Sequence, residues 1–197
     1  MKKRVAVFVS GGGTNLQTLL DAQASGALKS GEIALVISSK EGVYALERAK
    51  KAGVPTFAIP RKGIALEEFE ARCAALLEEY QIDYIVLAGF LTIFSEGFIR
   101  RFPNKMINVH PALIPAFCGK GFYGLRVHEA ALERGVKLTG ATVHFVNEVC
   151  DGGPIIAQKA VEVLPGDTPE TLQRRVMEQA EWVLLPQALE MVCAGEK

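Results

Sequence analysis

The order of apolar and polar residues predicts alternating strands and helices over the first half of the chain. Short apolar runs, typical of buried strands, are separated by segments whose apolar residues recur every three or four positions, which is the spacing of one helix face. Strands are predicted over 4–10, 33–38, 54–59 and 84–88, and helices from 14 or 15 onward, over 43–52 and over 66–80, where Phe69, Cys73, Leu76, Leu77 and Tyr80 form the expected core stripe.

The second half follows a different pattern, with short β-rich runs and one long loop. The loop is rich in proline, glycine and aromatic residues. The β-rich runs 139–146 and 155–163 are separated by a turn and are expected to pair antiparallel. The remaining elements are a strand over 106–109, a helix from about 125 and a last helix from Pro169 to about 193.

Together the two patterns predict an α/β protein. Strands that alternate with helices are typical of a doubly wound sheet, and the last strands add antiparallel pairs. The chain has no linker, repeat or low-complexity segment, and 197 residues fit one globular domain. We therefore predict a single domain over 1–197, built on one mixed, mostly parallel sheet flanked by helices.

Composition and charge argue against several classes of partner. Lys and Arg together number 22, as do Asp and Glu, so the net charge is zero and no nucleic-acid partner is expected. The basic start at Met1–Arg4 leads into an apolar run too short for a secretory signal. No apolar run approaches the roughly 18 residues that span a bilayer, so no membrane partner is expected. The four cysteines form no CxxC pair, which favours a cytoplasmic protein.

Asn108, His110 and Asp151 are the residue types needed to move an acyl or formyl group onto an amine. The amide can donate a hydrogen bond to a developing oxyanion, the imidazole can hold or deliver a proton, and the carboxylate can fix and polarise the imidazole. Asn108 and His110 are two residues apart, so they face the same side of a strand end, which Pro111 terminates. Asp151 comes directly before a Gly-Gly-Pro turn.

A glycine-rich turn, Ser10-Gly11-Gly12-Gly13-Thr14-Asn15, joins the first strand to the first helix. Backbone N–H groups in such a turn can approach an anion, and the helix start favours negative charge. Leu16 replaces the third glycine of a dinucleotide fingerprint, and no Gly-Lys-Ser/Thr follows, so a monophosphate on a small substrate fits better than a dinucleotide. A purely structural turn is the alternative.

Other residues carry two interpretations each. The segment 88–94 follows the most apolar strand, where it would either hold a flat aromatic ligand or fill the core. His144 would face either the site or the core, whereas His128 fits a packed helix face. A thiolate at Cys118 or Cys150, or a zinc site using His110, His144 and a cysteine, has no supporting spacing, so no metal is expected.

These motifs together resemble the folate-dependent formyltransferase family, and within it the phosphoribosylglycinamide formyltransferases (glycinamide ribonucleotide transformylases). The resemblance rests on Ser-Gly-Gly-Gly-Thr-Asn-Leu, Leu-Ala-Gly-Phe-Leu, Ile-Asn-Val-His-Pro-Ala-Leu-Ile-Pro, Gly-Ala-Thr-Val-His-Phe-Val and Asp-Gly-Gly-Pro-Ile-Ile, and it runs from about Val5 to Leu189. It implies a Rossmann-like formyltransferase fold and 10-formyltetrahydrofolate as co-substrate.

The resemblance also implies a role for each matching residue. Asn108, His110 and Asp151 would be the catalytic set, and His144 and Glu181 would touch the substrate or support residues that do. The remaining positions are the substrate-phosphate residues Gly13, Thr14 and Asn15, and the folate-binding residues Leu91, Thr92, Ile93, Phe94, Asn108 and, in the loop 146–151, Asn147.

The chain departs from the family at four places. Many members have Arg at Thr92 and a basic residue near Leu66, so contacts to the glutamate tail of folate would fall to Arg61 or Lys62. Trp182 stands where many members have His. The segment 118–124 lengthens the loop after the His-Pro motif, which would reshape the mouth of the site.

The expected reaction is formyl transfer to the amine of 5'-phosphoribosylglycinamide in purine (IMP) synthesis. Residues 1–105 would form the phosphate-binding half and 106–197 the catalytic and folate-binding half, in a monomer or homodimer. Two alternatives stay open: a formyltetrahydrofolate hydrolase-like core, in which water replaces the amine, and a nucleotide-binding module without chemistry.

Overall fold

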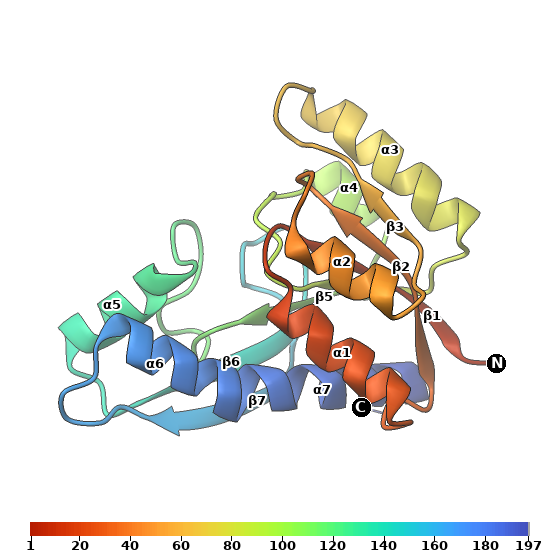
Figure 1. The fold of residues 1–197 in the computed structure, drawn as a ribbon. Helices are drawn as coiled ribbons and strands as arrows, with labels where there is room; N and C mark the ends of the chain where they lie inside the picture. The colour runs from red at the N-terminus through yellow and green to blue at the C-terminus, as the bar shows by residue number, and fades with distance from the viewer. Residues whose placement is uncertain (197) are drawn as a thin grey trace.

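A seven-stranded sheet carries the fold, in the order β3-β2-β1-β4-β5-β6-β7 (Figure 1). The computed structural model describes residues 1–196; Lys197, which the domain prediction includes, lies outside them. The neighbouring strands β3, β2, β1, β4 and β5 run parallel to one another. Strands β6 and β7 add two antiparallel pairs, so the mixed, mostly parallel sheet is confirmed. The strands are β1 Lys3–Val9, β2 Gly31–Ser38, β3 Thr56–Ala58, β4 Tyr84–Leu87, β5 Met106–His110, β6 Leu138–Phe145 and β7 Ile155–Glu162.

Helices cover both faces of the sheet and create two apolar cores. One core includes side chains from α1, α2, α5, α6 and α7, and the other includes side chains from α3 and α4 (Figure 1). The doubly wound arrangement is therefore as predicted. The helices are α1 Thr14–Ala24, α2 Tyr44–Lys51, α3 Leu66–Glu79, α4 Glu96–Arg100, α5 Leu125–Arg134, α6 Pro169–Val176, a π-helical turn Met177–Glu181 and α7 Trp182–Ala194.

Strand β1 shows why its sequence is apolar throughout. Val5, Val7 and Val9 point into one core, and Ala6 and Phe8 point into the other, with none of the five exposed. A strand covered on both faces has no polar side to present to water. Its carboxyl end therefore leads directly from the core into the glycine-rich turn.

An aromatic cluster supports the segment that follows β4. The rings of Phe94 and Phe98 stack at 4.4 Å, and Phe94 also meets Phe8 edge-on at 5.6 Å. Phe94 is buried, whereas Leu91 and Ile93 are 57% and 65% exposed. Phe94 of this segment therefore fills the core, as one of the two interpretations expected, whereas Leu91 and Ile93 face solvent.

Three elements differ from the prediction. Helix α4 was not predicted, because it is one short turn whose start depends on Ser95 accepting a hydrogen bond from the Phe98 N–H. The last helix is not uniform, since a π-helical turn at Met177–Glu181 shifts the helix phase before α7 begins. In α3, Leu76 and Tyr80 are only partly buried, at the edge of the core stripe.

Within residues 1–196, no helix is long and apolar enough to cross a membrane.

His128 on α5 is fully buried, and neither of its ring nitrogens has a hydrogen-bond partner within the described chain. Burial, and secondarily the proximity of His110, lowers the pKa of His128 from 6.5 to about 4. The buried ring binds a proton less readily than the same ring in the unfolded chain. The free energy of unfolding should therefore have its full value above pH 6.5 and should fall as the pH drops from 6.5 toward 4.

We expect His128→Leu to remove this acid sensitivity. Between pH 7.5 and pH 5 the wild-type protein should lose about 2 kcal/mol more of its free energy of unfolding than the variant. Denaturant unfolding at both pH values measures the difference. The comparison uses the change with pH in each protein, so a general effect of the substitution cancels. Equal losses would contradict a neutral buried His128.

Candidate active site

The site begins at the end of β5, where the sheet changes from parallel to antiparallel pairing. Asn108 lies beside Leu87 of β4 on one side and opposite His144 of β6 on the other. The Asn108 Nδ2 atom is 3.2 Å from His144 Nε2. His144 Nδ1 donates to the carbonyl of Phe145, 2.9 Å away, which leaves Nε2 facing the Asn108 amide. Of the two interpretations of His144, the structure supports the one facing the site.

Asp151 reaches this group from the tight loop between β6 and β7. A side chain at Gly153 would come within 1.8 Å of the Phe145 carbonyl oxygen, and one at Gly152 would collide with Val149. The loop can therefore close only with two glycines, and Asp151 before them takes a left-handed φ of 55°. This is the physical reason for the Asp-Gly-Gly-Pro motif.

The Asp151 carboxylate lies among all three of the other polar side chains. Its Oδ2 atom is 3.6 Å from His110 Nδ1, and its Oδ1 atom is 3.6 Å from His144 Nε2. The Asn108 Nδ2 atom is 3.4 Å from Oδ1. Asn108 and His110, which are two residues apart in β5, thus meet the distant Asp151 at one point, as predicted.

The loop after the His-Pro motif holds two of these residues. The Phe117 carbonyl accepts a hydrogen bond of 2.8 Å from His110 Nε2, and the Gly119 N–H donates one of 2.8 Å to Asp151 Oδ2. Sequence reasoning missed both contacts because they use backbone atoms. The loop itself is anchored to β6, where the Thr142 hydroxyl donates to the Ala112 carbonyl.

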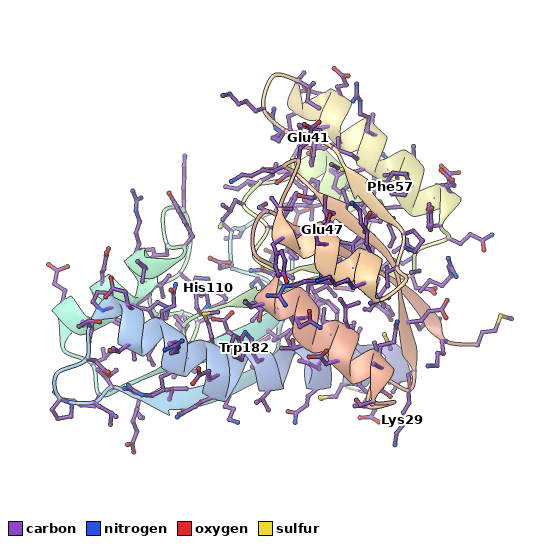
Figure 2. The ribbon with its side chains drawn as sticks, viewed as in Figure 1. Lys29, Glu41, Glu47, Phe57, His110 and Trp182 are labelled. Carbon is purple, nitrogen blue, oxygen red and sulfur yellow. The ribbon has the colours of Figure 1, made fainter. Side chains whose placement is uncertain are left out.

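Figure 2 shows His110 where β5 ends, between the α5 side of the molecule and the first two helices in this view. Only 4% of its side chain is exposed. Its Nε2–H is committed to the Phe117 carbonyl, so Nδ1 is the nitrogen that faces Asp151 and the polar group around it.

Asp151 and His110 differ in charge at neutral pH because their surroundings shift their pKa values. Burial opposes ionisation of Asp151, but the contact with His144, the hydrogen bond from the Gly119 N–H and the proximity of the two imidazoles outweigh it and hold the pKa of Asp151 below its usual value. Burial lowers the pKa of His110, while the Asp151 charge favours the protonated ring. At neutral pH the carboxylate is ionised, and His110 is mainly neutral but readily stabilised as a cation.

The glycine-rich turn lies at the carboxyl end of β1. Gly13 precedes α1 with a left-handed φ of 73°, and a Cβ there would lie 2.6 Å from that of Ala45. Only glycine satisfies both conditions. Thr14 begins α1, and the first turn of that helix contains no acidic residue that would repel an anion.

Asn15 connects this turn to the end of the chain. Its Nδ2 atom donates to Glu181 Oε2 at 2.7 Å, and its Oδ1 atom is buried without a partner in the described residues. Burial raises the pKa of Glu181, and the Asn15 amide only partly opposes this. The two predicted residues are therefore in direct contact.

The predicted folate-binding residues divide by exposure. Leu91 and Ile93 are exposed and Thr92 is half-buried, but the Phe94 side chain is in the core, so only its backbone is available to a ligand. Asn147 braces its own loop, since its side chain accepts from the Val149 N–H and donates to the Gly152 carbonyl. The Arg61 guanidinium donates to the Ile64 carbonyl, whereas Lys62 is exposed.

The cysteines near the site are thiols. Burial, and next the charge of Asp151, raises the pKa of both Cys118 and Cys150. Cys118 donates to the Pro115 carbonyl, and Cys150 lies 3.8 Å from Asp151 Oδ2. Across residues 1–196, no group of three or more His, Cys, Asp or Glu side chains is placed to hold a metal ion.

Comparison with known proteins agrees with this arrangement. Residues 3–189 match the family described as formyl transferase. The crystal structure of glycinamide ribonucleotide transformylase 1 from Symbiobacterium toebii superposes with a TM-score of 0.91 at 40% identity, covering 98% of this chain and 89% of that one. The human trifunctional purine biosynthetic protein adenosine-3 is 45% identical over 195 residues, covering 98% of this chain.

A formyltetrahydrofolate deformylase from Pseudomonas syringae also shares the fold, with a TM-score of 0.89, 30% identity and 99% of this chain covered. This chain spans 62% of the deformylase and 19% of the human protein. The α/β fold of this chain is shared with both of these crystal structures. The chain belongs to the formyl transferase family, and it is similar to the phosphoribosylglycinamide formyltransferases within it.

We expect Gly13→Ala to weaken binding of phosphorylated ligands about tenfold, because a left-handed alanine costs about 1–2 kcal/mol and its Cβ would also displace Ala45. Gly11→Ala is the matched control, since a Cβ at Gly11 meets nothing within 4 Å. Calorimetry with ribose 5-phosphate measures both affinities. Equal effects at the two positions would count against the turn as a phosphate site.

Proposed function

We propose that this protein transfers the formyl group of 10-formyltetrahydrofolate to the amine of 5'-phosphoribosylglycinamide, a step of purine synthesis. The observation that carries the proposal is the convergence of Asn108, His110 and Asp151 at one point at the end of β5. The similarity to glycinamide ribonucleotide transformylase 1 from Symbiobacterium toebii, 40% identical over 98% of this chain, supports the same reaction.

The co-substrate supplies the formyl group, and the residues beside the catalytic group suit a ligand that is flat and largely apolar. Leu91, Ile93 and Val149 expose apolar side chains next to the ends of β4 and β6. The backbone of 91–94 and the loop containing Asn147 then offer hydrogen-bonding groups. In this proposal they hold the pterin part of the folate and place its formyl carbon near Asn108.

The three catalytic side chains have separate tasks. The Asn108 amide donates to the formyl oxygen as negative charge develops there. His110, once protonated, stabilises the same charge through Nδ1, while its Nε2–H remains anchored to Phe117 and the Asp151 carboxylate stabilises the cation. Asp151, through water, carries a proton from the attacking amine toward the folate nitrogen that leaves as the new carbon–nitrogen bond forms.

His144 acts through Asn108 rather than on the substrate. Its Nε2 accepts from the Asn108 Nδ2 atom and so sets the direction of the amide. It also adds to the field that keeps Asp151 ionised. It is therefore a positioning residue in this proposal.

The substrate phosphate would bind at Gly13, Thr14 and Asn15, with the α1 N-terminus adding favourable charge. Glu181, held by Asn15, would accept hydrogen bonds from the ribose hydroxyls. Residues 1–105 would then supply the phosphate site and 106–197 the catalytic centre and most of the folate site. We propose that the protein works in the cytoplasm as a monomer or homodimer.

The similarity to the deformylase supports a second candidate, hydrolysis of 10-formyltetrahydrofolate. Turnover of this folate with and without phosphoribosylglycinamide separates the two. Formyl transfer requires the amine, so we expect rapid folate turnover and formylated product only when it is present. Equal turnover without it would establish hydrolysis, and no turnover in either mixture would indicate a binding module.

We expect Asp151→Asn to lower kcat by roughly 10²- to 10⁴-fold, because the amide can neither stabilise protonated His110 nor accept a proton. Affinity for both substrates should remain, since the proposed binding residues lie elsewhere. His110→Asn should be similarly severe, and the double variant should cost far less than the product of the two. Single-turnover rates with direct binding measurements test this. Near-normal turnover in Asp151→Asn would remove it from the mechanism.

A further inference from the structure

Arg48 of α2 reaches the glycine-rich turn from outside. Its Nε atom donates to the Gly12 carbonyl at 2.9 Å, and its Nη1 atom donates to Gln17 Oε1 at 2.9 Å. Figure 2 marks the neighbouring Glu47 on α2, which lies beside α1 in this view. The guanidinium thus joins the turn, the first helix and the second helix.

These contacts determine which way the peptide groups of the turn point. The Gly11 carbonyl accepts from the Ala45 N–H at 3.2 Å, and the Gly12 carbonyl accepts from Arg48. Both carbonyl oxygens are therefore directed toward α2. Because the N–H of each following residue points opposite to the carbonyl of the same peptide, those of Gly12 and Gly13 are directed away from α2, where an anion can be bound.

The Arg48 side chain is itself fixed on several sides. Gln17, its partner, also donates to Asp21 Oδ1 at 2.8 Å. The Tyr44 ring lies 4.7 Å beneath the guanidinium carbon, a cation–π contact. An arginine held this way loses little further freedom when a ligand arrives.

The positive charge of Arg48 is not neutralised. Glu47, the neighbouring carboxylate, pairs with Lys50 at 3.0 Å. Within residues 1–196, no carboxylate lies within ion-pair distance of Arg48. Arg48 is thus a fixed cation without a carboxylate partner, next to a turn whose N–H groups point away from α2. This combination favours an anionic ligand at the turn.

We propose that Arg48 is a positioning residue for the substrate phosphate, which orients the peptides of the turn and adds positive charge behind it. This inference rests on the phosphate site of the proposed function. It gives α2 a role in substrate binding through a residue that lies outside the motif Gly13-Thr14-Asn15.

The test compares Arg48→Met, Arg48→Lys and the matched control Lys50→Met, which removes the same charge from the same helix. Calorimetry with ribose 5-phosphate and with inorganic phosphate should show about tenfold weaker binding in Arg48→Met. Arg48→Lys keeps the charge but not the planar fork, so its loss should be intermediate. Lys50→Met should bind as the wild type does.

The kinetic expectation is a rise of about tenfold in KM for phosphoribosylglycinamide, with KM for the folate unchanged and kcat within threefold. A merely structural role would alter both substrates together. Equal affinities for ribose 5-phosphate in Arg48→Met and Lys50→Met would overturn the inference. Absence of formyl transfer by the wild type would instead refute the proposed reaction, and the calorimetric comparison would still decide the role of Arg48.

Discussion

The arrangement of the site depends on how the buried charge of Asp151 is compensated. A carboxylate that is only 9% exposed is stable when donors and cations surround it. The Gly119 N–H and the Asn108 amide donate to it, and His110, when protonated, places a cation beside it; these groups come from the loop after β5 and from β5 itself. The carboxylate therefore joins its own loop to β5 and to the loop that follows β5, whose contacting residues lie 32 to 43 positions earlier in the chain.

The change of strand direction at β5 makes this convergence possible. Strand β4 is parallel to β5, whereas β6 is antiparallel to it, and the register of the β5–β6 pair places His144 directly opposite Asn108. The loop after β5 then returns over its own strand end. Its Phe117 carbonyl holds His110, and its Gly119 N–H holds Asp151.

Both proposed binding regions lie at the carboxyl edge of the parallel strands, where ligands of open α/β sheets bind. The glycine-rich turn follows β1, the segment 91–94 with its exposed Leu91 and Ile93 follows β4, and Asn108 and His110 lie at the carboxyl end of β5. These three strands are neighbours in the sheet. In the proposed reaction, a phosphorylated amine and a folate would meet at Asn108 while their distant ends are held apart, so that an oriented encounter replaces a chance one.

The sequence by itself determined the elements and the residue types of the site. Apolar periodicity predicted the buried strands and most helices, and the short motifs around Asn108, Asp151 and Gly13 predicted the chemistry. Tertiary structure decided what depends on backbone atoms and on contacts between distant segments. The Phe117 carbonyl, the Gly119 N–H and the hold of Arg48 on the Gly12 carbonyl have no residue pattern, because every residue has the same peptide group. Likewise, only packing could show that His144 faces the site while Phe94 fills the core.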